Sequence, residues 1–474
     1  MKFKGDAYIN TIGCQMNVYD SEKLALILNS NGYRQTRNMD QADIVVCNTC
    51  SIRHKAEEKA FSFLGRFARI KKKNPDIIIV MAGCVAQQEG KKAFKRVPHL
   101  DIVLGTQAFS RFGKHIDAVK AGKNRIVDIE NSEKFYEIMP ALLESNIAES
   151  DAAGSTIPEH GTLNFKENKI SRFVTIMQGC ENFCTYCVVP YVRGKERSRN
   201  PESIIKEISL LAQSGVKEIN LLGQNVNSYG QQEGQISFAE LLAQVSKIRG
   251  IQRIRFATSH PKDLSMDLIH AIRDLDKVCN HLHLPVQSGS DKILKKMNRG
   301  YSRQTYIKRI TDLKKQCPDI GISTDIIVGF PSETRDDFSE TMDLLREIKF
   351  DSIYAFAYSD RSSAPASKFS HQVDEKEKLD RLNKLLELQE HYTKQKNLEL
   401  IGKTLEILVE GQSAKKHNGF KKNHKDMEQM TGRSACNKIV HFPSESAKIG
   451  DIIKIQIKNA YPHSLWGYPA GALN

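Results

Sequence analysis

Short apolar runs alternate with helical segments along most of this chain, and this alternation constrains its fold more than any other feature. In the first part, β-rich runs lie at 7–12, 43–47, 76–81 and 101–104. Helical patterns lie between them, at 19–31, 54–72 and 86–96. Near-continuous apolar strands joined by helices predict a parallel sheet covered on both faces. We therefore predict a doubly wound α/β domain over residues 1–127.

A cysteine follows each of the first three runs. Cys14, Cys50 and Cys84 lie just past successive strands, 36 and 34 residues apart. The carboxyl ends of parallel strands share one edge, so these thiols are expected to converge there. Each also lies near a helix N-terminus, where the dipole favours thiolate. Buried core cysteines are the alternative, but three at successive strand ends favour a cluster site. Cys47, inside an apolar run, is interpreted as core.

A second alternation spans residues 169–396. Its predicted strands lie at 173–177, 217–222, 253–257, 281–284, 322–328 and 352–357. Its predicted helices lie at 201–214, 238–248, 265–274, 290–297, 303–317 and 334–348. Six β/α units predict an open (β/α)6 barrel, short of the full eight.

Polar or glycine-rich turns follow four of these strands. In such barrels the chemistry lies at the strand carboxyl ends, so these turns form a candidate rim for a small ligand. Any one of them alone is an ordinary turn. The rim candidates are Gly223, Gln224, Asn225, Ser259, His260, Gln287, Ser288 and Phe330. Cys279 and Cys317 lie away from this rim and are interpreted as structural.

The loop after the run at 173–177 carries three closely spaced cysteines. Cys180, Cys184 and Cys187 have the spacing C-x3-C-x2-C. Soft thiolates select iron–sulfur clusters or zinc, but structural zinc needs four ligands, and no Cys or His follows within thirty residues. A 4Fe–4S cube held by three thiolates keeps one iron open for a ligand. A zinc knuckle lacking a ligand, or a chance grouping, is the alternative.

Two segments differ in texture from the α/β units. Residues 128–160 hold eight acidic residues and one lysine, which favours a solvated acidic linker (128–168) over a segment that wraps a basic neighbour. After a charged helix at 374–400, strands at 403–410, 438–442 and 451–459 predict a small antiparallel β-barrel over 397–474. The loop 415–425 has five lysines, two histidines and no acid. This loop favours a phosphate-backbone contact over a merely solvated turn.

Composition indicates the class of protein, its location and the charge of its partner. The chain has 474 residues, 40% of them hydrophobic and 27% charged, which is typical of globular proteins of two to four domains. No apolar run approaches the ~20 residues of a membrane span, and the start lacks a signal-peptide core. Ten cysteines without a disulfide pattern indicate reduced thiols and a cytoplasmic location. A net charge of +14 suits a polyanionic partner.

Together these motifs resemble the methylthiotransferases of the radical S-adenosylmethionine (SAM) superfamily. The chain is most similar to the tRNA-2-methylthio-N6-dimethylallyladenosine synthase branch, because Gln15 and Met16 follow Cys14 where the ribosomal-protein-modifying branch has proline and lysine. The resemblance covers nearly the whole chain. The motifs that carry it are 13–17 with 20–22, 48–53, 83–87, 184–191 and 281–290.

The resemblance implies a function and its cofactors. Cys180, Cys184 and Cys187 would bind a 4Fe–4S cluster whose open iron chelates SAM, and Cys14, Cys50 and Cys84 an auxiliary 4Fe–4S cluster that carries the sulfur. We expect Tyr186, Arg299 and the rim residues to contact SAM. The substrate would be isopentenylated adenosine beside the anticodon, in a tRNA anticodon stem–loop held by a C-terminal barrel of the TRAM type. An external electron donor and a sulfur or cluster donor are also expected, and the chain is expected to be a monomer.

Two other functions fit the same motifs. The first is the same chemistry on another target, either a ribosomal protein or threonylcarbamoyladenosine. The second is a non-catalytic iron–sulfur protein that binds RNA or senses redox state. Release of 5′-deoxyadenosine from SAM separates the second from any radical enzyme.

Overall fold

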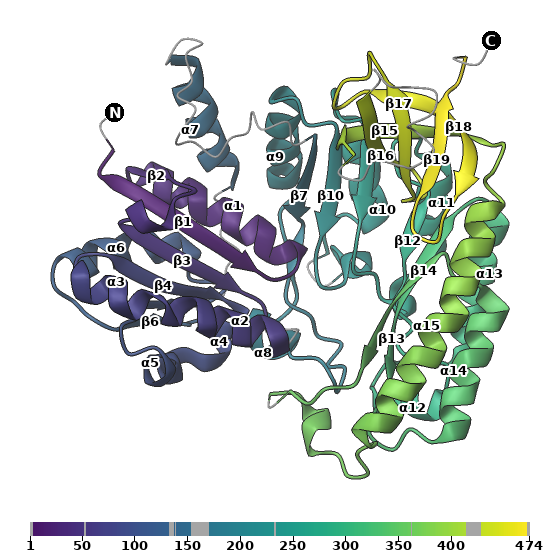
Figure 1. The fold of residues 1–474 in the computed structure, drawn as a ribbon, viewed down its shortest axis with the longest axis horizontal. Coiled ribbons are helices and arrows are strands. Elements are labelled where there is room, and N and C mark those ends of the chain that lie inside the picture. Colours follow the sequence, from purple (N-terminus) through teal and green to yellow (C-terminus); the bar gives the residue numbers. More distant parts are fainter. Residues whose placement is uncertain are drawn as a thin grey trace.

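The computed structural model describes residues 3–51, 54–131, 137, 139–152, 170–231, 234–361, 363–413 and 428–471. Three units follow one another along the chain (Figure 1). An N-terminal sheet comes first, a half-barrel of parallel strands second, and a small closed barrel last. Within the described residues, no helix is long and apolar enough to cross a membrane.

The N-terminal unit is a six-stranded parallel sheet in the order β2-β1-β3-β4-β5-β6. Its strands are β1 (Gly5–Ile12), β2 (Tyr33–Gln35), β3 (Ile44–Thr49), β4 (Ile78–Gly83), β5 (Ile102–Leu104) and β6 (Ile126–Asp128). The four predicted strands are confirmed. The structure adds β2 and β6, two three-residue strands that were not predicted.

Helices cover both faces of this sheet. They are α1 (Gln15–Ser30), α2 (His54–Gly65), α3 (Phe67–Lys73), α4 (Cys84–Glu89), α5 (Ala93–Arg96) and α6 (Phe112–Lys120). Side chains of β3 alternate between the two resulting cores. Ile44 and Val46 pack with α1 and α6, while Val45 and Cys47 pack with α2 and α3. Cys47 is therefore a core residue, as predicted.

The acidic segment contains a packed helix, α7 (Met139–Ala152). Met139 and Leu143 are buried in the core of the half-barrel. Glu137, just before α7, accepts a hydrogen bond from Arg199 Nε at 2.8 Å. The expectation of a solvated tether is therefore wrong for this part of the segment, because its apolar start and its acid both have partners. Residues 153–168 lie outside the described residues.

The second unit contains six parallel strands in two three-stranded sheets, β11-β10-β7 and β12-β13-β14. They are β7 (Ser171–Thr175), β10 (Glu218–Leu222), β11 (Arg253–Phe256), β12 (His281–His283), β13 (Gly321–Val328) and β14 (Ser352–Ala357). A bridge between Ile254 and Val278 joins the two sheets. The predicted open (β/α)6 barrel is thus present. Two-residue strands β8 (Met177–Gln178) and β9 (Arg197–Ser198) pair beside the cysteine loop.

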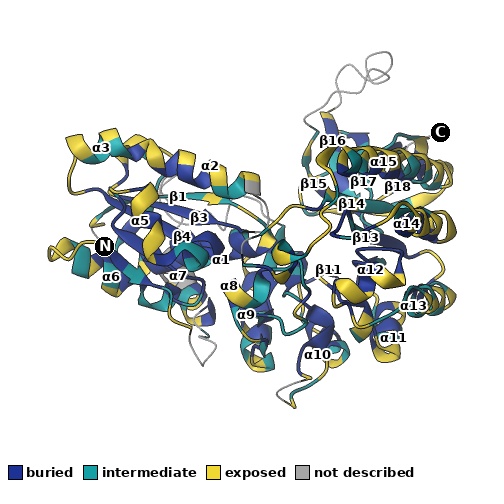
Figure 2. Cartoon of the chain, turned by 90° about the horizontal axis from the view of Figure 1, so that it is seen from below, coloured by how far each residue is buried: buried dark blue, intermediate teal, exposed yellow. Residues whose placement is uncertain are grey.

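Seven helices belong to the outside of the half-barrel: α9 (Pro201–Gln213), α10 (Phe238–Ser246), α11 (Met266–Asp274), α12 (Asp291–Lys296), α13 (Arg303–Gln316), α14 (Arg335–Ile348) and α15 (Glu375–Leu398). The short helix α8 (Val189–Arg193) follows the cysteine loop and packs against α4 instead. Figure 2 shows that the strands are mostly buried, whereas helices such as α3 and α14 turn exposed residues outward.

The third unit is a closed five-stranded barrel in the order β15-β16-β17-β19-β18. Its strands are β15 (Thr404–Gln412), β16 (Glu428–Ser434), β17 (Ile439–Ser444), β18 (Ile452–Ala460) and β19 (Leu465–Pro469). It packs against the amino ends of the half-barrel strands. Arg253 donates to the carbonyls of Glu406 and Arg433, and Arg255 donates to that of Ser434. The predicted lysine-rich loop 415–425 lies outside the described residues.

Candidate functional site

Three cysteines meet at the carboxyl edge of the N-terminal sheet; we call Cys14, Cys50 and Cys84 the N-terminal trio. Cys14 is the N-cap of α1, Cys50 follows β3 directly, and Cys84 is the first residue of α4. The strands before them are neighbours, with Ile12 opposite Thr49 and Thr49 opposite Gly83. The predicted convergence is therefore present in the fold.

Two buried asparagines hold this edge together. Asn17 Oδ1 accepts from the Cys14 amide and thiol, at 3.3 Å each, and its Nδ2 donates to Asn48 Oδ1 at 3.1 Å. Asn48 Nδ2 donates to the Asn17 carbonyl at 2.9 Å. A Cβ at Gly13 would lie 2.8 Å from Cys50 Cβ, so only glycine allows this approach. The first turn of α1 is thereby fixed to the end of β3.

The thiols of this trio influence one another. A hydrogen bond with Cys50 lowers the pKa of Cys14 to about 6, against the effect of burial. Burial raises the pKa of Cys84, and the charge of Cys14 adds to that rise. Cys14 therefore ionises most readily of the pair, which suits a soft-metal ligand.

A buried arginine from the half-barrel reaches this trio. Arg193, at the end of α8, donates to Asp20 Oδ2 at 2.6 Å and is only 4% exposed. Its charge opposes the pKa rise of Cys84, as does a side-chain hydrogen bond between them, and it also lowers the pKa of Cys14. No role was expected for Arg193, which lies just beyond the motif at 184–191.

The second set of cysteines lies on one loop; we call Cys180, Cys184 and Cys187 the barrel trio. The Cys187 amide donates to the Cys184 carbonyl at 3.0 Å, and the Cys180 amide donates to the Gly194 carbonyl at 3.3 Å. Gly179 has a φ of +83°, and a Cβ there would collide with the Lys195 carbonyl. The loop is thus folded back on the segment that follows α8.

Burial raises the pKa of Cys180 to about 11 and that of Cys187 to about 12, and the charge of Cys184 adds to both. The three sulfurs therefore lie close enough to repel as thiolates. Among the described residues, no group of three His, Cys, Asp or Glu side chains is gathered tightly enough for a single metal ion.

A second buried arginine, Arg299, supports the barrel trio. Its Nη1 donates to Cys184 Sγ at 3.3 Å and to the Tyr186 hydroxyl at 3.2 Å. Nη2 donates to the Pro285 carbonyl at 2.7 Å. Arg299 and Tyr186 were both expected to contact SAM. The structure places them beside the cysteine loop, where Arg299 uses its donors on the protein.

Two rim residues, and Asn227 beside them, carry buried polar atoms without a protein partner. These atoms are Ser259 Oγ, His260 Nε2 and both amide atoms of Asn227. Burial lowers the pKa of His260 to about 2, so the ring is neutral. Gln224 Oε1 accepts from the Gly179 amide at 2.5 Å, and Asn225 Oδ1 accepts from the His260 amide at 3.1 Å. This part of the rim is joined to the cysteine loop and has free donors and acceptors for a polar ligand.

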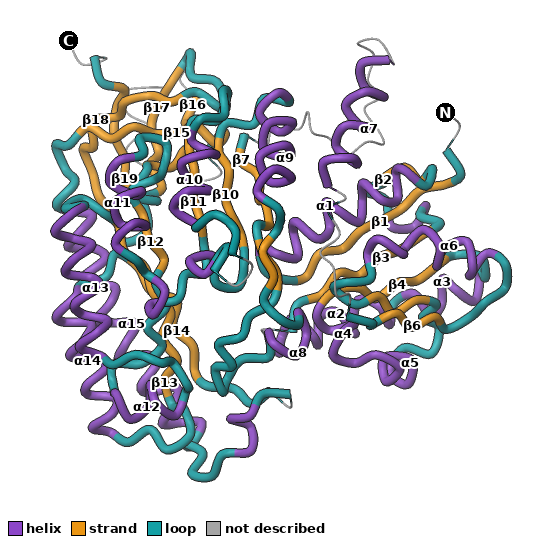
Figure 3. The backbone as a smooth tube through the Cα atoms, turned by 180° about the vertical axis from the view of Figure 1, so that it is seen from behind, coloured by secondary structure: helices purple, strands orange, loops and turns teal. Residues whose placement is uncertain are grey.

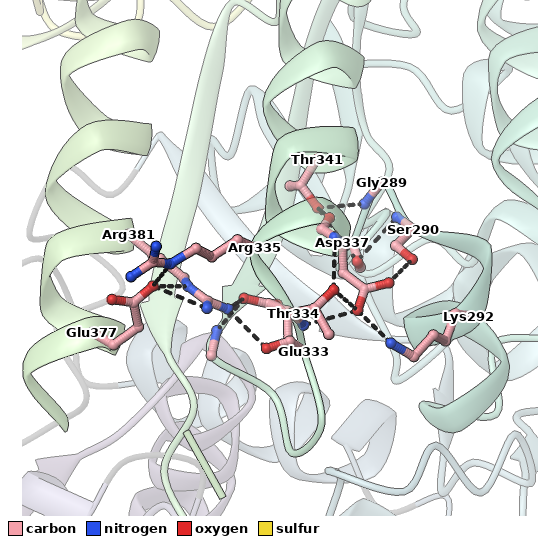
Figure 4. Close-up of polar contacts among 12 residues, drawn as sticks. Gly289, Ser290, Lys292, Glu333, Thr334, Arg335, Asp337, Thr341, Glu377 and Arg381 are labelled. Atoms are coloured by element: carbon pink, nitrogen blue, oxygen red, sulfur yellow. Dashed lines mark hydrogen bonds and ion pairs between the residues drawn. The ribbon is translucent and has the colours of Figure 1, made fainter. Parts of the chain in front are cut away.

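Gln287 and Ser288, the rim residues after β12, are fixed by hydrogen bonds within the protein. Gln287 has a φ of +74° and pairs with β13, where its carbonyl accepts from the Ile327 amide. A close-up shows the support for the loop that follows (Figure 4). Asp337 Oδ1 accepts from Ser290 and Oδ2 from Lys292, each at 2.7 Å, while the Ser288 hydroxyl accepts from the Ser290 amide at 3.2 Å.

Phe330 and Gly223 offer a ligand no exposed side chain. Phe330 is fully buried between Tyr358 and Phe369, with ring centroids 5.2 and 6.1 Å away. Its expected contact with SAM is not supported, because its ring presents no surface to a ligand. Gly223 packs against Met177, which a Cβ would overlap.

One short helix connects the two trios. The Val189 amide at the start of α8 is 3.5 Å from Cys187 Sγ, and Arg193 at its end reaches Cys84. Gln107 donates to the Arg193 carbonyl and Thr106 to the Val192 carbonyl, each at 2.9 Å. Figure 3 shows α8 beside α4, whose first residue is Cys84. The N-terminal sheet and the cysteine loop are thus fixed together at this helix.

Family models match all three units. The model described as uncharacterized protein family UPF0004 matches residues 6–105. The radical SAM superfamily matches residues 174–345, and the TRAM domain matches residues 399–468. Among solved structures, the radical SAM methyltransferase TsrM from Kitasatospora setae is similar with a TM-score of 0.56. That likeness covers 77% of this chain and 75% of the other at 11% identity, and it shows the fold alone.

Two full-length relatives carry the same name. The tRNA-2-methylthio-N(6)-dimethylallyladenosine synthase of Desulfosudis oleivorans is 48% identical over 98% of this chain and 96% of its own length. The enzyme of the same name from Syntrophus aciditrophicus is 46% identical over 98% of this chain and 94% of its own length. This chain therefore belongs to the tRNA-2-methylthio-N(6)-dimethylallyladenosine synthase family of the radical SAM superfamily.

Proposed function

We propose that this chain converts N6-dimethylallyladenosine next to the anticodon of tRNA into its 2-methylthio derivative. The observation that carries this proposal is the pair of cysteine trios joined through α8. Three thiolates on a 4Fe–4S cube would leave one iron open at each trio, and each trio has a buried arginine beside it. The names of the full-length relatives supply the target.

Membership of the radical SAM superfamily implies one 4Fe–4S cluster and SAM; the second cluster is part of our proposal. When bound, a cluster on the barrel trio together with SAM would supply a 5′-deoxyadenosyl radical, and a cluster on the N-terminal trio would supply sulfur. In the net reaction the C2–H bond breaks and a C2–S bond forms; the hydrogen leaves in 5′-deoxyadenosine, and the rest of the first SAM leaves as methionine. A second SAM gives the methyl group and becomes S-adenosylhomocysteine. An external donor supplies the electrons, and a sulfur donor restores the cluster.

The residues of the chain position these groups. Arg299 fixes the Cys184 side of the barrel trio, and Arg193 brings a positive charge to the N-terminal trio. His260, held neutral by burial, offers a ring nitrogen at the rim without adding charge. These three groups are set before any substrate arrives, because each is buried and held by backbone or side-chain partners.

We further propose division of labour among four segments. Residues 1–127 hold the auxiliary cluster, residues 128–168 connect, residues 169–396 form the radical SAM barrel, and residues 397–474 hold the tRNA phosphates. The ten cysteines are free of disulfides, which fits a reducing cytoplasm. We propose that the chain acts as a monomer.

Nucleoside analysis tests this function directly. The reconstituted protein is incubated with SAM, a reductant and tRNA that carries N6-dimethylallyladenosine. The tRNA is then digested, and its nucleosides are separated by chromatography and identified by mass spectrometry. The expected result is a 2-methylthio product together with 5′-deoxyadenosine. Release of 5′-deoxyadenosine without a methylthio product on this tRNA would point to another target. Failure to release it under reducing conditions would point to the non-catalytic function.

A further inference from the structure

One aromatic side chain of the cysteine loop is exposed although its backbone is strained. Phe183, the residue before Cys184, has a φ of +46°, a left-handed conformation that residues other than glycine seldom adopt. Its side chain is 51% exposed, so packing of the ring does not offset this strain. Strained backbone of this kind persists only where surrounding contacts impose it, and it concentrates at functional sites. The Phe183 ring is therefore a candidate contact for a ligand.

The end of α12 holds the loop in this conformation. Asn298 Nδ2 donates to the Phe183 carbonyl at 3.1 Å. The Thr185 hydroxyl donates to the Lys296 carbonyl at 2.9 Å, and the Thr185 amide donates to the Met297 carbonyl at 3.1 Å. The backbone of the cysteine loop therefore lies directly against the last residue of α12 and the residues that follow it. These contacts fix Phe183 beside the end of this helix.

Two lysines lie at this end of α12. Lys295 and Lys296 are exposed and belong to its last turn. Lys292, one turn earlier, is paired with Asp337 at 2.7 Å. In the part of the chain that the structure describes, the ammonium groups of Lys295 and Lys296 have neither a hydrogen-bond nor an ion-pair partner. We call Phe183, Lys295 and Lys296 the loop platform. It combines an open aromatic ring with two positive charges that the protein does not neutralise.

The chemistry of the loop platform fits a single-stranded nucleic acid. Aromatic rings stack on the face of any base, and lysines neutralise the phosphates on either side of it. The bases of a duplex are stacked on one another, so the strand has to be unpaired where it meets the ring. The place of the platform limits which nucleotide can reach it. Phe183 directly precedes Cys184 of the barrel trio, so the stacked base would lie close to the nucleotide that is modified.

We propose that the loop platform binds a nucleotide adjacent to the target adenosine, with Phe183 stacking on its base and Lys295 and Lys296 contacting the flanking phosphates. The proposal rests on the proposed function, since it names a contact of the anticodon loop outside the site of the modified base. Stacking and phosphate contacts do not read base edges, so this contact tolerates different neighbouring bases. It positions the RNA strand while the target base is extruded.

The test for the ring measures RNA affinity. An anticodon stem–loop that carries N6-dimethylallyladenosine is titrated against the reconstituted full-length protein, and fluorescence anisotropy gives the dissociation constant. Phe183→Ala should weaken binding by about 10-fold through lost stacking. Phe183→Tyr keeps an aromatic face and should retain affinity, whereas Phe183→Leu keeps apolar volume alone and should bind as weakly as Phe183→Ala. Iron is assayed in each variant, because Phe183 adjoins Cys184, and affinities are compared at equal iron content.

The test for the lysines measures how affinity depends on salt. Each phosphate contact to a single strand contributes about 0.7 to the slope of log affinity against log salt. The double variant Lys295→Gln and Lys296→Gln should therefore reduce that slope by about 1.4, whereas Phe183→Ala should leave the slope unchanged.

Matched controls lie at the opposite edge of the N-terminal sheet. Lys72 and Lys73 are exposed lysines in the last turn of α3, before the amino end of β4. Phe3 is 43% exposed and lies before the amino end of β1. The double variant Lys72→Gln and Lys73→Gln should leave the salt slope unchanged, and Phe3→Ala should leave the affinity unchanged.

Stem–loops that each lack one base of the loop identify the stacked nucleotide. Where the missing base is the one on Phe183, Phe183→Ala should cause no further loss of affinity. The platform is overturned if Phe183→Ala binds the complete stem–loop as tightly as the unaltered protein, if its loss stays the same whichever base is missing, or if the Lys295 and Lys296 variant keeps the full salt slope.

The proposed function fails separately from the platform. If the unaltered protein forms no methylthio product and Phe183→Ala still weakens RNA binding, the platform binds RNA and the assigned reaction is wrong. If the product forms and Phe183→Ala changes neither affinity nor the response to missing bases, the reaction stands and the platform is wrong.

Discussion

The two cysteine trios reach a similar arrangement by different routes. The barrel trio lies within eight consecutive residues, whereas the N-terminal trio comes from three strand ends spread over 71 residues, 14–84. Each has one buried arginine at its sulfurs, and each arginine comes from a distant segment. Arg299 lies 115 residues beyond Cys184, and Arg193 belongs to the half-barrel although it faces Cys84. A local motif holds its ligands within one loop, whereas the N-terminal trio is assembled by the order of strands in its sheet, and only its arginine depends on how the two units dock.

Removing each trio in turn gives the largest expected difference between them. Replacing Cys14, Cys50 and Cys84 with alanine should lower iron from about eight to about four per chain, and so should replacing Cys180, Cys184 and Cys187. Only the second variant should lose release of 5′-deoxyadenosine from SAM, because SAM is assigned to the barrel cluster. Iron and sulfide assays with chromatography of the nucleoside products measure both.

The matched control is the double variant Cys279→Ala and Cys317→Ala, which removes two buried cysteines outside both trios. It should keep all of its iron. Full iron in the first triple variant would show that the N-terminal trio binds no cluster, and the symmetry between the two sites would be lost.

The next largest effect is expected from replacing Arg193 or Arg299. Arg193→Gln, made where the barrel trio is already replaced, should weaken iron retention against a chelator by about 10-fold, since removing a group that orients metal ligands typically has this effect. Arg299→Gln, made where the N-terminal trio is replaced, should do the same. Arg193→Lys keeps the charge but loses the planar fork and should fall between.

The control makes each arginine variant in the protein that keeps only the other trio. Each arginine should leave iron retention at the other trio unchanged. If Arg193→Gln instead weakens the barrel cluster, α8 couples the two sites, and the arginines are not equivalent local supports.

The third largest effect is expected at the contact between α1 and the half-barrel, around Arg199. Arg199 Nη1 donates to Glu207 at 2.7 Å and Nε to Glu137 at 2.8 Å, while Tyr19 of α1 donates to Glu207 at 3.2 Å. Arg199 and Glu207 are each about 1% exposed. Arg199→Met leaves a buried carboxylate without its cation and should cost about 3–5 kcal/mol in urea unfolding.

Removing both charges tests the reason for that loss. The double variant Arg199→Met and Glu207→Met should recover most of the stability, because no unpaired charge remains buried. A double variant as unstable as the single one would mean that packing around Arg199, not charge burial, holds α1 against the half-barrel.

The two trios also differ in how far the sequence alone predicts them. The spacing of Cys180, Cys184 and Cys187 alone predicts that they form one site, without reference to the fold. Cys14, Cys50 and Cys84 needed the inference that parallel strands end at one edge, and register in the structure agrees. The role of Arg193 could not be read, because it depends on α8 turning back to the other unit.

Contacts between distant segments explain the remaining differences. The segment around α7 looked like a tether because its acids outnumber its lysine, yet Glu137 is paired with Arg199, 62 residues later. Phe330 looked like a rim residue from its position after a strand, but the ring turns into an aromatic cluster.

The smallest effect is expected at an exposed ion pair beside the buried one. Lys206 on α9 and Glu144 on α7 lie 2.9 Å apart, with side chains 54% and 47% exposed. Water and salt screen such a pair, so Glu144→Gln should cost no more than about 0.5 kcal/mol, and less at high salt. Urea unfolding beside Arg199→Met measures both in one assay. A loss above about 1 kcal/mol would exceed what exposed pairs contribute and would mean that α7 is held mainly by its surface charges. The buried Glu137 contact and the Met139 and Leu143 side chains should instead hold it, because they are removed from solvent.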